Sequence, residues 1–310
     1  MNLRSLRQAL RTQSRYALMR GVARFASIRA AVGGIRGALH RKRVKAFLAA
    51  RESVFESSLF PALDCSAFVA RLRADGIALG LQLPPDIVGS VLSYAEQNPC
   101  FADRQPELGF RPERRRDAEA RLGKPVLLAQ YFNTETRCAA ISSLLHDPKL
   151  EWIAARYLGS LPTFVGADLW WTFPVKPLEA DRDRHAHLFH RDVDDFRFFK
   201  FFFYLTPVHP GDGGHVCVVA SHARPPLVRW VDRWLLRRYS DAEIASCFAS
   251  QKILELCGPA GSGFAENTLC MHKGQTPTRE PRLLLQLQYA LFDYGVMHDR
   301  RDPAALRMLC

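Results

Sequence analysis

A series of short apolar segments, separated by turns that contain Gly and Pro, occupies the second half of the chain and restricts its fold more than any other feature. Aromatic and β-branched residues dominate these segments, as they do in antiparallel sheets. We predict strands at 163–173, 196–206, 214–220, 263–272 and 282–292. Helical patterns precede the strands, so the expected fold is a two-sheet β-barrel or jelly roll with helices packed outside.

The segments before residue 163 alternate between helical and extended patterns. We predict a helix from residue 65, a short strand at Gly76–Leu79, a helix at Asp86–Glu96, a polar loop or exposed insertion at 98–124, a strand at 125–133 and a helical pair at 134–158 divided at Asp147–Pro148. A further helical insertion is expected at 223–257. Its second helix begins at Ser240-Asp-Ala-Glu243, which is the pattern of a capping box. The folded body then spans 54–300, followed by a tail at 301–310.

The positive charge of the chain is concentrated in an N-terminal arm, residues 1–53. Residues 1–51 hold 13 of the 43 Lys and Arg residues and no Asp or Glu, whereas the remainder holds 30 basic and 31 acidic residues. The body is therefore close to neutral, which argues against a nucleic-acid-binding face. Apolar residues recur in the arm at helical spacing, and we expect Gly33, Gly34 and Gly37 to loosen it. Three interpretations remain open: contact of residues 1–51 with an anionic membrane, a mitochondrial-type presequence, or a charged helix packed on the body.

Cysteine usage and hydropathy indicate a cytoplasmic type of protein. The eight cysteines are scattered and form no C-x-x-C pair, which suggests free thiols and gives no zinc or iron–sulfur pattern. No apolar stretch reaches the roughly 18 residues that a membrane-spanning helix needs. Arginines interrupt every early apolar run, so a secretory signal is not expected.

Two histidines and one aspartate form a candidate metal site. In an extended segment His190 and Asp192 project from the same face, because they are two residues apart. An H-x-D triplet alone is weak evidence, since it often occurs by chance. His272 ends a predicted strand and supplies a second imidazole. Two imidazoles and one carboxylate, with the other positions open, are the facial triad of Fe(II) oxygenases.

Arg282 begins an otherwise apolar strand, where a buried guanidinium needs an anionic partner. A turn-rich connection, 273–281, precedes it and predicts an antiparallel hairpin that brings Arg282 alongside His272. The planar guanidinium can bind a carboxylate with two parallel hydrogen bonds. That carboxylate can belong to a ligand or to an Asp or Glu of the body, and the sequence leaves both alternatives open.

The order and spacing of these residues resemble the phytanoyl-CoA dioxygenase family of Fe(II)/2-oxoglutarate-dependent oxygenases. The stretch Phe189–His222 resembles the H-x-D motif, the long apolar strand and the Gly- and His-containing segment of that family, with Gly214 and Ala220 departing from the usual Pro and Gly. The stretch Gly263–Tyr289 resembles a second signature, in which a His-x-Gly turn precedes the Arg of the last strand. The resemblance covers roughly 65–293.

This resemblance implies a double-stranded β-helix in which His190, Asp192 and His272 bind iron and Arg282 binds the distal carboxylate of 2-oxoglutarate. It also places Gln130 and Tyr131 on a strand that often lines the co-substrate pocket, although they can equally be ordinary strand residues. The implied reaction consumes O2 and releases succinate and CO2, with hydroxylation of an unidentified small molecule or lipid. The carboxylate of Asp192 favours hydroxylation over halogenation, which needs a vacant metal position for the halide.

Two other functions remain open. A cupin-like metalloenzyme that does not use 2-oxoglutarate would keep the triad and make Arg282 structural. A non-catalytic peripheral membrane or adaptor protein would use the basic arm. Trp170 and Trp171 point to opposite faces of a strand, so at most one can face the cavity, and core packing is expected for either. His215 and His222 are expected at turns and barrel ends. His185 and His187 are expected at the mouth of the site, where the resemblance selects His190 over His187 as the ligand. Lys200, inside an apolar strand, has no assigned role.

Overall fold

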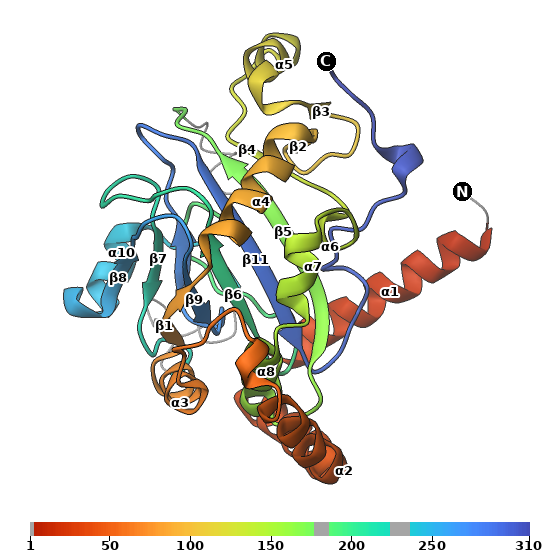
Figure 1. The fold of residues 1–310 in the computed structure, drawn as a ribbon, viewed down its shortest axis with the longest axis vertical. Helices are drawn as coiled ribbons and strands as arrows, with labels where there is room; N and C mark the ends of the chain where they lie inside the picture. Colours follow the sequence, from red (N-terminus) through yellow and green to blue (C-terminus); the bar gives the residue numbers. More distant parts are fainter. Residues whose placement is uncertain (1–2, 177–185, 224–235) are drawn as a thin grey trace.

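Two antiparallel sheets form the centre of the computed structural model, which describes residues 3–176, 186–223 and 236–310 (Figure 1). The large sheet has the strand order β1-β9-β6-β11-β5-β4-β2-β3, and the small sheet has the order β10-β7-β8. The large sheet contains β1 (Ile77–Gln82), β2 (Cys100–Ala102), β3 (Gly109–Phe110), β4 (Leu128–Gln130), β5 (Thr163–Thr172), β6 (Phe198–Tyr204), β9 (Ser262–Glu266) and β11 (Arg282–Ala290). The small sheet contains β7 (His215–Val218), β8 (Ile253–Leu256) and β10 (His272–Gly274).

Side-chain alternation in the central strands gives the large sheet two different faces. In β6 the odd-numbered residues Phe199, Phe201 and Phe203 belong to the main hydrophobic core, whereas Phe202 and Tyr204 pack toward the small sheet. Tyr204 connects the sheets directly, because its hydroxyl donates to the carbonyl of Leu256 over 2.9 Å. All seven residues of β6 are buried, which explains why the strand is an almost unbroken apolar run.

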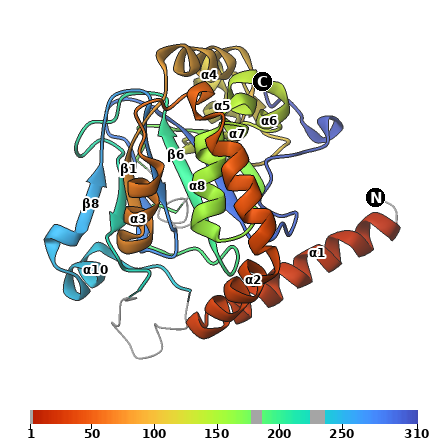
Figure 2. The same ribbon diagram turned by 60° about the horizontal axis from the view of Figure 1, so that its bottom comes forward.

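Helices cover the outer face of the large sheet (Figures 1 and 2). The helices of the body are α3 (Cys65–Asp75), α4 (Pro85–Gln97), α5 (Arg115–Leu122), α6 (Thr134–Arg137), α7 (Ala139–Leu145), α8 (Pro148–Leu158) and α10 (Asp241–Cys247). The division between α7 and α8 falls at Asp147, whose carboxylate caps α8. The predicted capping box of Ser240 and Glu243 is present at the start of α10. The layer of helices leaves the inner face of the sheet as the place for a site.

The basic arm forms two helices that pack on the body, α1 (Leu3–Val22) and α2 (Ala26–Glu52). Contacts between α2 and α8 include a hydrogen bond of 2.7 Å from Trp152 Nε1 to Glu52 and an ion pair of 2.8 Å between Arg51 and Glu151. Near the end of α1, Met19 and Ala23 are buried against Val193. Of the three interpretations of the arm, the contacts agree with a charged helical segment packed on the body.

The glycines of the arm do not loosen it, contrary to the prediction. Helix α2 runs through Gly33 and Gly37 without a break. A Cβ atom at Gly33 would lie 2.6 Å from a guanidinium nitrogen of Arg197, and one at Gly37 would lie 3.0 Å from the carbonyl oxygen of Gly159. These glycines therefore allow α2 to approach the body closely, a role that local sequence does not distinguish from flexibility.

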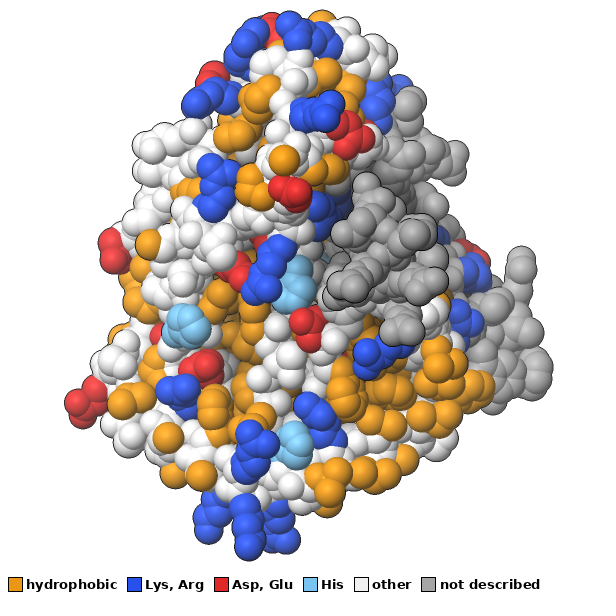
Figure 3. Space-filling model, turned by 90° about the vertical axis from the view of Figure 1, so that its right-hand side faces the viewer, with side chains coloured by type: hydrophobic (Ala, Val, Ile, Leu, Met, Phe, Trp, Pro, Cys, Tyr) orange, Lys and Arg blue, Asp and Glu red, His pale blue; other side chains and the backbone are white. Residues whose placement is uncertain are grey.

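On the face shown in Figure 3, Lys and Arg side chains are interspersed with hydrophobic, acidic and uncharged ones. Within the described ranges, none of the helices has the length and apolar character needed to cross a membrane.

The strand predictions are correct for β5, β6, β7 and β11, but the predicted strand 263–272 is wrong as a single element. Its first half is β9, in the large sheet, and its last residue begins β10, in the small sheet. Between them, the amide of Cys270 donates to the carbonyl of Asn267 in a turn. The segment 98–124, predicted as a loop, contains β2, β3 and α5, and the insertion 223–257 contains the strand β8 besides α10. Residues 224–235, in the first part of this insertion, lie outside the described residues.

Candidate metal centre

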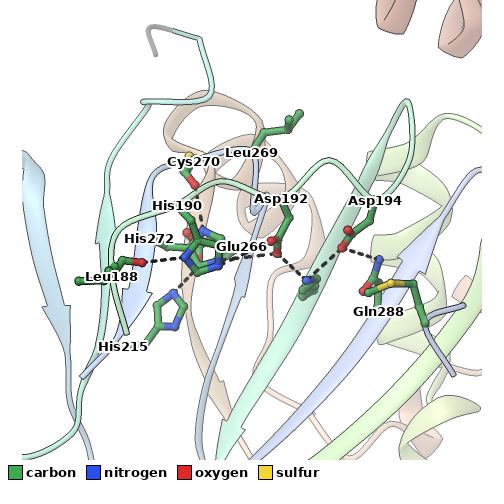
Figure 4. Close-up of polar contacts among 12 residues, drawn as sticks. Leu188, His190, Asp192, Asp194, His215, Glu266, Leu269, Cys270, His272 and Gln288 are labelled. Atoms are coloured by element: carbon green, nitrogen blue, oxygen red, sulfur yellow. Dashed lines mark hydrogen bonds and ion pairs between the residues drawn. The ribbon is translucent and has the colours of Figure 1, made fainter. Parts of the chain in front are cut away.

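His190, Asp192 and His272 converge at the inner face of the sheets (Figure 4). One ligand atom from each residue lies within 4.8 Å of the others. The Nε2 atom of His190 is 3.6 Å from Asp192 Oδ1, and that of His272 is 3.7 Å from Asp192 Oδ2. Among the described residues, this is the group of His, Cys, Asp and Glu side chains whose geometry fits a metal ion.

Both imidazoles are oriented by backbone carbonyls. Nδ1 of His190 is 3.0 Å from the carbonyl oxygen of Leu188, and Nδ1 of His272 is 2.9 Å from that of Cys270. Each ring therefore donates its Nδ1 proton to a carbonyl and presents Nε2 as the acceptor, which is the tautomer that binds a metal. Burial, and then the proximity of His272, hold the pKa of His190 well below its usual range, so this ring is neutral at pH 7.

Backbone hydrogen bonds between distant segments bring the three ligands together. His190 and His272 exchange two N–H···O bonds of 2.9 Å in an isolated antiparallel bridge, and the amide of Asp192 donates to the carbonyl of Thr268 over 2.8 Å. His190 and Asp192 are in the connection before β6, not in one regular strand. The predicted convergence is present, although the local structure that produces it differs from the prediction.

A buried cation, Lys200, neutralises the carboxylate of Asp192. Nζ of Lys200 donates to Asp192 Oδ2 over 2.7 Å and lies 3.2 Å from Asp194 Oδ2. Asp194 also accepts hydrogen bonds from the hydroxyl of Tyr16, on α1, over 3.0 Å and from Gln288 Nε2 over 3.2 Å. The network therefore extends from the candidate metal site to the N-terminal arm.

The charges in this network shift the pKa values of its members. Burial alone would raise the pKa of Asp192, but Lys200 and the two histidines have the larger combined effect and hold it below its usual range. For Lys200, burial alone would lower the pKa, whereas Asp192 and Asp194 raise it above its usual range. Asp192 is thus an anion and Lys200 a cation throughout the neutral pH range.

We expect Lys200→Met to destabilise the metal-free protein by about 3–5 kcal/mol at pH 7, because it leaves the buried carboxylate of Asp194 and the partly buried one of Asp192 without their cation. Urea unfolding measures this effect, with Lys42→Met, at an exposed position of α2, as the control. The folded-state pKa of Asp192 is lowered, so the stability it contributes is present above the ordinary carboxyl pKa of about 4 and is lost as the pH falls through the lowered value. The difference in free energy of unfolding between wild type and variant should therefore shrink in acid. Equal free energies of unfolding at pH 7 would show that the ion pairs of Lys200 do not stabilise the protein.

A cavity of about 500 Å³ opens beside the triad. Its described lining comes from both sheets, from α1, from the loop before β3 and from the segments around 187–194 and 236–238. Inward-facing residues of the large sheet that line it are Asp168, Trp170, Lys200, Phe202, Arg282, Leu284 and Gln286. A volume of this size is typical of small-molecule sites.

Arg282 lies in this cavity, but the predicted hairpin with His272 is wrong. β11 pairs with β5 and β6 in the large sheet, whereas β10 pairs with β7 in the small sheet. The connection 275–281 crosses from one sheet to the other, and the carboxylate of Asp212 fixes it by accepting from the amides of Thr278 and Arg279. Arg282 and His272 therefore line the same cavity from opposite sheets.

The guanidinium of Arg282 is buried without an ion-pair partner among the described residues. It donates to the carbonyl of Gly213 and, over 3.2 Å, to the hydroxyl of Thr172. Its Nε atom has no hydrogen-bond partner. The alternative of an ion pair with a described Asp or Glu is therefore not found. Burial lowers the pKa of Arg282, yet an arginine remains charged in proteins, so a cation lines this part of the cavity.

The other two predicted pocket residues, Gln130 and Tyr131, are not part of the described lining of the cavity. Tyr131 is in the main core, where its hydroxyl donates to the carbonyl of Ala95 over 2.6 Å and accepts from Trp171 Nε1 over 2.9 Å. Gln130 is buried and donates a hydrogen bond of 2.6 Å to Asp168, a residue that lines the cavity. Of the two tryptophans, Trp170 lines the cavity and Trp171 packs against the core.

The remaining histidines have different surroundings. Nε2 of His215 lies 2.6 Å from a carboxylate oxygen of the buried Glu266, and its ring stacks on His272 with centroids 5.5 Å apart. Burial lowers the pKa of His215 and raises that of Glu266, so it favours the uncharged form of each group. His187 lines the cavity with Nδ1 2.7 Å from the hydroxyl of Thr276. His222 is 3.3 Å from Cys270 Sγ, and His185 lies outside the described residues.

Comparison with known proteins finds no matching family model and no matching curated protein sequence. Solved structures do match. HygX from Streptomyces hygroscopicus, solved with nickel, 2-oxoglutarate and hygromycin B bound, has 17% identity and a TM-score of 0.50, over 78% of this chain and 93% of that chain.

Two further solved structures have lower scores. SnoN, an epimerase solved with Fe3+, alpha ketoglutarate and nogalamycin RO, has 14% identity and a TM-score of 0.47, over 73% of this chain and 82% of that chain. EctD from S. alaskensis, solved with bound Fe, has 15% identity and a TM-score of 0.47, over 80% of this chain and 88% of that chain. At these identities, the likeness to HygX establishes a shared fold, and membership in the phytanoyl-CoA dioxygenase family stays a prediction.

Proposed function

We propose that this protein is an Fe(II)- and 2-oxoglutarate-dependent dioxygenase that hydroxylates a small molecule, with release of succinate and CO2. The observation that carries the proposal is a two-histidine, one-carboxylate triad in the same cavity as a buried arginine without an ion-pair partner among the described residues. HygX, which shares the fold, binds nickel and 2-oxoglutarate, and this supports the same pair of ligands here. The two facing antiparallel sheets would then be a double-stranded β-helix.

In this proposal the chain positions the ligands and supplies the electrostatics. His190, Asp192 and His272 would hold the metal through two Nε2 atoms and one carboxylate oxygen, leaving the other coordination positions for co-substrate and O2. Bound iron supplies the oxidation of 2-oxoglutarate and substrate. Lys200 holds the second oxygen of Asp192, so the carboxylate keeps one orientation.

Arg282 would bind the distal carboxylate of 2-oxoglutarate. Its free Nε and the hydroxyl of the adjacent Thr172 give donors at the end of the cavity formed by the start of β11. A carboxylate there would replace the missing counter-ion of the guanidinium. This feature also weighs against the cupin-like alternative, which requires a structural partner for Arg282.

The test is the production of succinate by purified protein supplied with Fe(II), 2-oxoglutarate and pools of small molecules. We expect succinate formation that requires both iron and 2-oxoglutarate and that rises when the pool contains the substrate. Iron-dependent turnover without succinate would favour the cupin-like enzyme. Iron binding with no turnover in any pool would favour a non-catalytic protein that keeps the metal site.

A further inference from the structure

The N-terminal helix α1 forms part of the wall of the cavity, although the sequence places it outside the folded body. Tyr16 and Arg20, one helical turn apart, both line the cavity. The hydrogen bond from Tyr16 to Asp194 and the burial of Met19 fix the position of this turn. Arg20 is therefore held at the cavity by the packing of the helix.

The described lining of the cavity contains an excess of cations. It includes seven Lys and Arg residues and three Asp residues: Arg20, Arg104, Arg191, Lys200, Arg237, Arg238 and Arg282, and Asp168, Asp192 and Asp194. The proposed function accounts for Arg282 through 2-oxoglutarate and for Asp192 through the metal, and Lys200 already pairs with Asp192 and Asp194. Asp168 accepts from the amides of Gln130 and Gln286, and burial raises its pKa although the charge of Arg104 acts in the opposite direction.

Arg237 forms an ion pair with Glu243 over 2.9 Å, and Arg191 and Arg238 have interactions of their own. Arg20 and Arg104 are the two remaining cations of the lining. Neither forms an ion pair with a described residue, and each guanidinium lies near an aromatic ring of the lining, that of Arg20 at 5.7 Å from the centroid of Tyr16 and that of Arg104 at 5.8 Å from the centroid of Trp170. Both side chains are exposed, so they lie at the mouth of the cavity and not at the buried end of the cavity.

The backbone that carries Arg104 has an unusual conformation. Asp103 and Arg104 have φ angles of 53° and 61°, which non-glycine residues adopt at a cost in energy. An ion pair of 2.7 Å between Asp103 and Lys124 stabilises this turn, as does a 3.0 Å bond from the Asp103 amide to the carbonyl of Leu128. The surrounding structure therefore maintains a strained turn that directs Arg104 to the cavity.

We propose that the substrate carries an anionic group, a phosphate or a carboxylate, which Arg20 and Arg104 bind at the mouth of the cavity while the rest of the substrate extends toward the metal. The inference rests on the proposed function, because it assigns the substrate end of the same cavity. It makes α1 a determinant of specificity, since a cation on this helix selects the substrate by charge.

The experiment measures binding of phenyl phosphate, benzoate and the neutral analogue benzyl alcohol by calorimetry. The full-length protein is loaded with Ni(II) and saturating 2-oxoglutarate, so that the metal and Arg282 are occupied. We expect both anions to bind more tightly than benzyl alcohol, and Arg20→Gln or Arg104→Gln to weaken anion binding about fivefold each without changing that of benzyl alcohol. Preference for one anion identifies the group.

Matched controls are Arg15→Gln, on the same helix, and Arg116→Gln, on α5, which are exposed arginines that do not line the cavity. The proposal is overturned if wild type binds the anions no better than benzyl alcohol, or if the control variants weaken binding as much as Arg20→Gln and Arg104→Gln. Binding of 2-oxoglutarate is titrated first on the same sample. Its absence would count against the proposed function, whereas normal 2-oxoglutarate binding without anion preference would count against this inference alone.

Discussion

Replacement of His272 by alanine is expected to remove iron binding and turnover while the protein stays folded. The side chain supplies one of three ligand atoms within 4.8 Å of one another. Substitutions that only disturb the orientation of a metal ligand reduce affinity by about 10–100-fold, so loss of the ligand itself should exceed about 100-fold. The fold should survive, because the two 2.9 Å hydrogen bonds between His272 and His190 belong to the backbone.

The measurement is the number of iron atoms per chain after anaerobic loading, with circular dichroism on the same sample. His187→Ala is the matched control, because His187 lines the same cavity but is bonded to Thr276 and is not part of the triad. We expect one iron per chain in wild type and in His187→Ala. Full occupancy and turnover in His272→Ala would remove this residue from the site, and equal losses in both variants would mean that any change in the cavity disrupts binding.

The central strands could be predicted because burial on both faces leaves a strong local signal. β6 and β11 are buried along their whole length, so their sequences are nearly continuous apolar runs. The short strand β10 has three residues and gives no such signal. The boundary between β9 and β10 was missed for this reason, and with it the assignment of His272 and Arg282 to different sheets.

The candidate ligands could be identified because their spacing and residue types are visible in the sequence. The contacts that support them form between residues distant in sequence and are not. Lys200 stood out as a charge within an apolar strand, yet its partners Asp192 and Asp194 become evident only when the chain folds back. Tyr16 and Asp194 are separated by 178 positions, so nothing local links α1 to the metal centre. Burial of Tyr131 in the core likewise depends on Ala95, in a helix distant in sequence.

Arg282→Ala is expected to raise the 2-oxoglutarate concentration required for succinate formation far more than it affects iron binding. The guanidinium is buried, and its contacts with Gly213 and Thr172 leave Nε without a partner. Loss of a charge-assisted contact in a partly dry cavity should cost about 2–5 kcal/mol. At about 1.4 kcal/mol per tenfold change, the apparent affinity for 2-oxoglutarate should fall by tens- to thousands-fold.

Two further variants separate recognition of a carboxylate from structural support. Arg282→Lys keeps a cation but not the planar pair of donors, so we expect an intermediate affinity for 2-oxoglutarate. Arg279→Ala, in the same connection but exposed and paired with Asp212, should behave as wild type. Succinate formation is measured against 2-oxoglutarate concentration, and iron binding and urea unfolding are followed separately. A 2-oxoglutarate dependence equal to that of wild type in Arg282→Ala would make the residue structural and favour the cupin-like enzyme. Loss of iron binding in the same variant would instead place Arg282 in the support of the metal site, because its hydrogen bond to the carbonyl of Gly213 joins β11 to the segment that leads into β7 of the small sheet.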